Sequence, residues 1–162
     1  MVSPVLVLDT NIWLDWLIFD DISTLPLTNA KKNKKLRIVI DEHCRDEFVR
    51  VLSYPKLRLT KFEKAKYISE FDEHSINVKI PAKKSLSLLP QCRDKDDQKF
   101  LRLAEFARAD WLVSRDNDLL RLNTKLSKNC FQIITCLDWG NIYVNQPNLR
   151  HPICLLDRFD ND

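Results

Sequence analysis

The stretch RDKDDQKFLRLAEFARADWLVSRDNDLLRL, residues 93–122, decides the fold of this chain because a helix, a strand and a second helix follow one another within it. Acids open an amphipathic helix, and the short apolar strand that follows leads to Asp116. The N-terminus repeats the second half of this pattern, since the apolar run VLVL leads to Asp9 and then to a helix. Short apolar strands that feed helices are typical of a parallel sheet covered by helices, so the pattern predicts an α/β fold.

The rest of the chain shows the same alternation of apolar runs and helical periods. Strands are expected at residues 5–9, 37–40, 76–80, 111–114 and 131–135, and helices at residues 10–19, 41–53, 60–73, 94–108 and 116–122. Thr60 and Glu63 have the spacing of a capping box. Residues 20–35 are expected to be less regular. The order predicts one domain over residues 1–140, with helices on both faces of a sheet, and an irregular C-terminal tail over residues 141–162.

Composition narrows the class of protein. A hydrophobic content of 44% and a charged content of 30% are those of an ordinary globular domain, and 162 residues suffice for one core. The single glycine, Gly140, excludes the glycine-rich loops that bind nucleotide phosphates. A net charge of +3 permits nucleic acid as a partner without demanding it.

The cysteines and the apolar runs bear on the cellular location. Five cysteines, an odd number with no CxxC pair, argue against a disulfide framework or a zinc site. Reduced thiols of this kind are typical of a cytoplasmic protein. No apolar run approaches membrane-spanning length, and the start MVSPVLVLDT does not have the features of a signal peptide. We therefore expect a cytoplasmic protein with no membrane partner.

Acids are expected to gather at one edge of the sheet. Asp9 and Asp116 both follow strands, and ligands of parallel sheets bind outside the carboxyl ends of the strands. Asp97 lies on the apolar side of its helix, where a carboxylate is costly unless it is paired or binds a metal. Asp96 also points partly inward, so geometry alone does not separate the two. Acids with no histidine or cysteine beside them favour a hard cation held by oxygen.

Each acid also has a purely structural explanation. Asp9 and Asp116 could each cap the helix that follows, which is a common use of aspartate after a strand. Glu47 could pair with a neighbouring arginine on a solvated helix face. Asp118 could simply favour the positive end of its helix dipole. The functional interpretation therefore depends on the coincidence of several acids at one sheet edge.

Four segments of the chain resemble the PIN-domain ribonucleases, in particular the VapC-like toxins of bacterial toxin–antitoxin pairs. The resemblance extends over residues 4–136 and is carried by LDTN (8–11), DEFVRVLSYPKL (46–57), CRDKDDQKFLRLA (92–104) and ADWLVSRDNDLL (109–120). It implies a PIN-like three-layer α/β/α sandwich with a central, mostly parallel sheet, and a nuclease domain over residues 1–140. One departure is Arg108, where relatives often have glycine.

The resemblance also implies an activity and a set of residues. The activity is that of a Mg²⁺- or Mn²⁺-dependent endoribonuclease that cleaves single-stranded RNA. The family's catalytic and metal-binding acids correspond to Asp9, Glu47, Asp97 and Asp116, with Asp118 as a further acid and with Asn11 and Ser114 in support. The helix alignment selects Asp97 rather than Asp96. The implied partners are RNA, a cognate antitoxin and a second copy of the chain.

Two alternatives to this interpretation stay open. The chain could be a PIN-like RNA- or protein-binding module with little catalysis, although such a module has no need of four costly acids. An α/β phosphatase or response-regulator-like domain also gathers aspartates at strand ends, but that scheme gives Asp97 no role. The lysine run formed by Lys31, Lys32, Lys34 and Lys35 is the first candidate for binding RNA, and its alternative is a solubilising loop.

Overall fold

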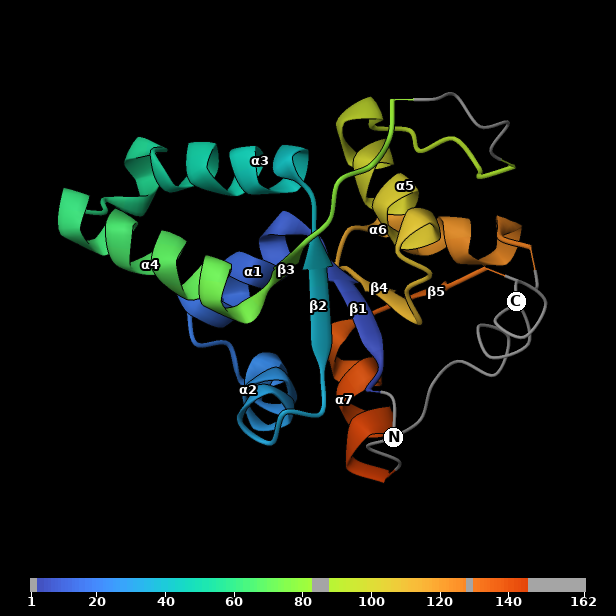
Figure 1. The fold of residues 1–162 in the computed structure, drawn as a ribbon, viewed down its shortest axis with the longest axis horizontal. Coiled ribbons are helices and arrows are strands. Elements are labelled where there is room, and N and C mark those ends of the chain that lie inside the picture. The colour runs from blue at the N-terminus through green and yellow to red at the C-terminus, as the bar shows by residue number, and fades with distance from the viewer. Residues whose placement is uncertain (1–2, 83–87, 128–129, 146–162) are drawn as a thin grey trace.

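The computed structural model describes residues 3–82, 88–127 and 130–145, and it contains a five-stranded sheet with the order β3-β2-β1-β4-β5 (Figure 1). All four neighbouring strand pairs are parallel. The strands are β1 (Val5–Leu8), β2 (Arg37–Ile40), β3 (Ile76–Asn77), β4 (Trp111–Val113) and β5 (Gln132–Ile134). The α-helices are α1 (Thr10–Leu17), α2 (Leu25–Lys32), α3 (Glu42–Leu52), α4 (Lys61–His74), α5 (Gln98–Phe106), α6 (Asn117–Leu120) and α7 (Cys136–Asn145). Short 3-10 turns are η1 (Ile22–Thr24), η2 (Pro55–Leu57), η3 (Lys95–Asp97) and η4 (Arg121–Lys125).

Helices cover both faces of the sheet, so the predicted three-layer α/β/α architecture is confirmed. Successive strand residues point to opposite faces. Leu6 and Leu8 of β1 therefore join the first core, which packs against α1, α2, α3, α4 and α7. Val5 and Val7 join the second core, which packs mainly against α5 and α6. Because both faces are buried, the strands read as continuous apolar runs rather than as alternating ones.

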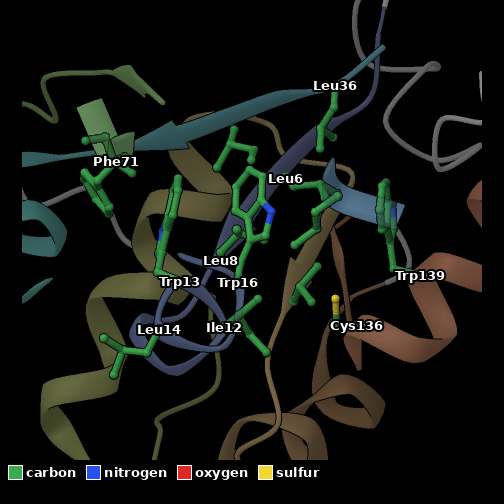
Figure 2. Packing of buried hydrophobic residues seen from close by; sticks show 14 of the residues in the cluster. Leu6, Leu8, Ile12, Trp13, Leu14, Trp16, Leu36, Phe71, Cys136 and Trp139 are labelled. Atoms are coloured by element: carbon green, nitrogen blue, oxygen red, sulfur yellow. The ribbon is translucent and has the colours of Figure 1, made fainter. Parts of the chain in front are cut away.

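Aromatic side chains fill the first core, as Figure 2 shows. The rings of Trp13 and Phe71 lie 4.3 Å apart between their centroids, and Phe48 stacks on Phe71 at 4.4 Å. Trp16 lies 5.5 Å from Trp13. Each such pair contributes about 0.5–1.5 kcal/mol beyond the burial of its surface. These contacts fix α1 against α3 and α4, and α1 begins directly after Asp9.

Two helices, α2 and α7, were not predicted. Pro26 is tolerated in the first turn of α2, where its missing N–H would have no partner within the helix. Leu27 and Ala30 of this helix are fully buried, and α7 packs on the same side of the sheet. A Cβ added at Gly140 of α7 would lie 2.8 Å from Cγ of Pro26, so the single glycine allows the close approach of the two helices. Tertiary packing, rather than local periodicity, specifies both of them.

The predicted C-terminal tail begins inside a helix. Helix α7 continues through residue 140 to Asn145, so the first five residues of the predicted tail, 141–145, are helical rather than irregular. Residues 146–162 lie outside the described part of the chain. Across the described ranges, no helix combines the length and the apolarity that a membrane crossing requires.

Other boundaries differ in ways that have physical reasons. The strand expected at residues 76–80 is only two residues long, because β3 is an edge strand with exposed side chains. One further hydrogen bond, from Val78 N to Ile40 O at 2.8 Å, continues the pairing. After α5 ends, Arg108 adopts a φ of 49°, in the left-handed region that favours glycine. The departure from the family pattern at Arg108 therefore falls on a backbone position where glycine would be less strained.

Candidate active site

Strands β1 and β4 meet where the chain changes direction across the sheet. From β1 the chain proceeds to β2 and β3 on one side, and β4 and β5 lie on the other. Ligands of open parallel sheets bind outside the carboxyl ends of the strands at such a point. Leu8 of β1 pairs with Val113 of β4, and Asp9 N donates to Val113 O at 3.1 Å. Asp9 and Ser114 are thereby brought side by side at this edge.

Asp9 is a buried carboxylate that uses its two oxygens differently. It is only 3% exposed. Its Oδ1 accepts from Ile12 N at 3.2 Å, which caps α1, while its Oδ2 accepts from Ser114 Oγ. The pKa of Asp9 is raised to about 6, chiefly by burial and to a smaller extent by the charge of Asp116, against the lowering effect of its hydrogen bonds. The structural explanation of Asp9 as a cap is therefore correct, but it accounts for only one of its oxygens.

Ser114 connects Asp9 to Asp116. Its buried hydroxyl donates to Asp9 and accepts from Asp116 N at 3.0 Å. Its backbone N donates to Ile134 O at 3.0 Å, so β5 holds the residue in place. Asp116 in turn caps α6, because its Oδ1 accepts from Asp118 N at 2.8 Å. One serine hydroxyl thus fixes the spacing of two acids on neighbouring strands.

Asp97 joins these acids from the turn between η3 and α5. Its pKa is raised to about 7, first by burial, then by a side-chain hydrogen bond with Asp116, and then by the charges of Asp94, Asp116 and Asp9. Asp96 is exposed and is not among these causes. A hydrogen bond between two carboxyl groups requires one of them to be protonated. The structure therefore brings Asp97, rather than Asp96, to Asp9 and Asp116.

Glu47 of α3 is held by other partners. Its Oε2 accepts from Thr10 Oγ1, next in sequence to Asp9, and its Oε1 lies 3.2 Å from Lys99 Nζ and 3.9 Å from Arg50 Nη2. Sequence reasoning missed Thr10 and Lys99. The only signal for them was position, since Thr10 follows Asp9 and Lys99 lies two residues after Asp97. Glu47 therefore lies beside the acids in a pair with a cation.

The two remaining predicted residues are at the rim. Asn11 is exposed at the second position of α1, and its backbone N–H helps to lower the pKa of Asp9. Asp118 is partly exposed, with its Oδ1 3.9 Å from Arg121 Nη1. Neither side chain is brought into the hydrogen-bonded set formed by Asp9, Ser114 and Asp116.

The lysine run lies near the amino ends of the strands, on the opposite side of the sheet from their carboxyl ends. Lys31 and Lys32 occupy the last turn of α2, and the chain then enters β2 at Arg37, which is the amino end of that strand. The acids lie at the carboxyl ends. In Figure 1, α2 lies below the sheet, whereas β2 points upward toward α3. The structure therefore does not bring the lysine run to the acids, and its role in RNA binding stays a prediction.

The donor set fits a hard divalent cation in its chemistry. Asp9, Asp97 and Asp116 offer only carboxylate oxygens, which Mg²⁺ and Mn²⁺ prefer. Among the described residues, however, no three histidine, cysteine, aspartate or glutamate side chains are grouped closely enough to hold an ion. Binding an ion would therefore require the carboxylates to turn toward it, and Asp9 and Asp97, whose pKa values are raised to about 6 and about 7, to be ionised.

Comparison with known proteins gives one family. The sequence model described as the PIN domain matches residues 5–118, which is more than half of the chain. The matched region includes every strand-end acid described above, together with Glu47 and Lys99. It ends before β5 and α7. A search among curated proteins finds no match.

Proposed function

Because the chain belongs to the PIN-domain family, we propose that it is a Mg²⁺- or Mn²⁺-dependent endoribonuclease that cleaves single-stranded RNA. Membership of this family indicates a nuclease in general. The observation that carries the finer proposal is the convergence of Asp9, Asp97 and Asp116 at the switch point of the sheet, with Ser114 binding two of them. Because no histidine lies among these three acids, we do not assign a histidine as the base that activates the attacking water.

Asp9, Asp97 and Asp116 would hold the divalent ion, and Glu47 would join them after leaving Lys99. When bound, the ion supplies Lewis acidity for phosphodiester hydrolysis. Ser114 keeps Asp9 oriented, because its hydroxyl is itself fixed by Asp116 N. The raised pKa values of Asp9 and Asp97 mean that these carboxyl groups release protons as the ion binds.

Metal dependence tests the proposal directly. Protein stripped of metal is expected to leave a single-stranded RNA intact, and added Mg²⁺ or Mn²⁺ is expected to start internal cleavage, measured by gel electrophoresis of an end-labelled strand. Excess EDTA should stop it.

The pair of Glu47 with Lys99 favours a second candidate, an RNA-binding module without catalysis. Binding of the strand with no cleavage under any of these conditions would select that module.

The toxin role is a further part of the proposal, supported by the resemblance of four segments to the VapC-like branch. Expression of the chain alone in a bacterial host is expected to stop growth, because an unrestrained ribonuclease degrades cellular RNA. The Asp116→Asn variant, expressed to the same level, should permit growth. Unimpaired growth with abundant wild-type protein would remove the toxin role and leave the nuclease proposal intact. The cognate antitoxin would then have no place in the proposal.

A further inference from the structure

A pocket of about 650 Å³ lies between the start of α3, the segment after β3 and the first turns of α5, and one of its lining residues, Lys99, pairs with Glu47. We call it the β2–β3 pocket. Its volume falls within the roughly 300–1,000 Å³ of small-molecule sites. Its polar and charged lining includes His43, Lys79, Lys99 and Arg102 together with Asp41 and Glu42. Val78 and Ile80 line it as well and pack against the second core.

The basic side chains of this pocket differ in whether they already have an acidic partner. Lys99 is paired with Glu47, with its Nζ also 2.6 Å from Asp96 O. Lys79 and Arg102 are exposed, and neither makes an ion pair within the described ranges. Of the two acids, Asp41 is buried and its Oδ1 accepts from Cys44 N at 2.9 Å, so it is occupied as the cap of α3. Glu42 is exposed, so the exposed charged side chains of the pocket are Lys79, Arg102 and this one acid. Two cations beside an apolar wall suit a ligand that carries both a phosphate and a base.

The pocket continues the edge of the sheet on which the acids lie. Asp41 follows β2 and Val78 follows β3, so the pocket stands over the carboxyl ends of these two strands. The acids stand over β1 and β4, which come next in the strand order. Neighbouring strands are about 4.8 Å apart, and Arg102 is roughly 8 Å along α5 from Asp97. This spacing is of the size of one nucleotide.

We propose that the β2–β3 pocket binds the substrate strand next to the scissile bond, with Lys79 and Arg102 on its phosphates and Val78 and Ile80 against a base. This assignment rests on the proposed function, because it names the path of the substrate away from the acids. Lys99 lies at the junction, since it lines the pocket and also contacts Glu47. The lysine run, which begins in the last turn of α2 and lies near the amino end of β2, is not on this path.

The salt dependence of strand binding tests the pocket. A short fluorescent oligouridine is titrated with protein in EDTA, which prevents cleavage, and its anisotropy gives Kd over a range of salt concentrations. The double variant Lys79→Gln with Arg102→Gln is expected to flatten the slope of log affinity against log salt by about 1.4, because each neutralised phosphate of a single strand accounts for about 0.7 of that slope. The charge-retaining pair Lys79→Arg with Arg102→Lys should restore the slope.

The matched control removes two charges from the opposite edge. Lys32→Gln with Lys35→Gln changes two exposed lysines and is expected to leave the slope unchanged. If the slope of log affinity against log salt flattened equally in both double variants, or in neither, the assignment of the strand to this pocket would be wrong. The proposal would also be overturned if the Lys79→Gln with Arg102→Gln variant bound the strand as the wild type does but no longer bound labelled uridine monophosphate. The pocket would then bind a free nucleotide rather than the strand. Since binding is measured without cleavage, these outcomes are independent of whether the chain is a nuclease.

Discussion

Asp97→Asn is expected to lower the rate of single-stranded RNA cleavage about 100-fold or more in saturating Mg²⁺. Loss of a residue that merely supports a metal ligand typically costs about 10–100-fold, and a ligand should cost at least as much. Asparagine keeps the size of the side chain but removes the charge that the ion requires. Initial rates measured on the same labelled strand give the effect.

Asp96→Asn is the matched control for this variant. It removes the same charge one residue earlier, from a side chain that is exposed. Its contact with Lys99 uses the backbone carbonyl, which the substitution does not change. Its cleavage rate should therefore stay near that of the wild type. Equal losses in the two variants, or an active Asp97→Asn protein, would remove Asp97 from the site.

Asp9→Asn is expected to abolish cleavage and, at the same time, to stabilise the metal-free protein at pH 8. The pKa of Asp9 is raised from 3.8 to about 6 by burial, so between these values the native state binds a proton that the unfolded state does not. The stability that comes from protonated Asp9 is present below pH 4 and is lost as the pH rises through 6. Burial of the ionised group then costs up to about 3 kcal/mol, which asparagine avoids.

Urea denaturation in EDTA at pH 5 and pH 8 measures this effect. The gain in the free energy of unfolding should be clearly larger at pH 8 than at pH 5, because Asp9 is mostly protonated at the lower pH. Added Mg²⁺ should stabilise the wild type and not the variant, since only a binding-competent native state is stabilised by a ligand. A variant that is less stable than the wild type at pH 8 would contradict this prediction, because the ionised Asp9 carboxylate would then stabilise the native state.

Much of the fold could be predicted because its elements carry local signals. The strand at residues 37–40 and the helices beginning after Asp41 and Thr60 follow from apolar runs and caps, and the capping box of Thr60 with Glu63 is confirmed. Helices α2 and α7 carry no such signal. Pro26 and Gly140 let these two helices approach each other closely, and a contact between positions so far apart in sequence has no local signal.

The candidate site also has a part that could be predicted from local signals and a part that could not. Asp9, Ser114 and Asp116 could be placed at one edge because each follows a strand, and parallel strands share the edge at which they end. The contacts of Glu47 could not be foreseen, because Thr10 and Lys99 reach it from α1 and α5 only after three helices have packed. The sequence also does not tell whether a basic residue lies at the amino ends or at the carboxyl ends of the strands. The run of lysines is conspicuous but lies at the amino ends of the strands, whereas Lys79 and Arg102 line a pocket with Lys99, which pairs with Glu47.

The hydrogen bond from Ser114 to Asp9 joins residues 105 positions apart, and so does the bond from Val5 N to Asp110 at 2.7 Å. At a synthesis rate of about 5–20 residues per second, roughly 5–20 s separate the appearance of the two halves of this site on the ribosome. Until β4 emerges, β1 is an edge strand and Asp9 has neither Ser114 nor Asp116 beside it. The growing chain therefore has no assembled acid site until β4 has emerged and paired with β1.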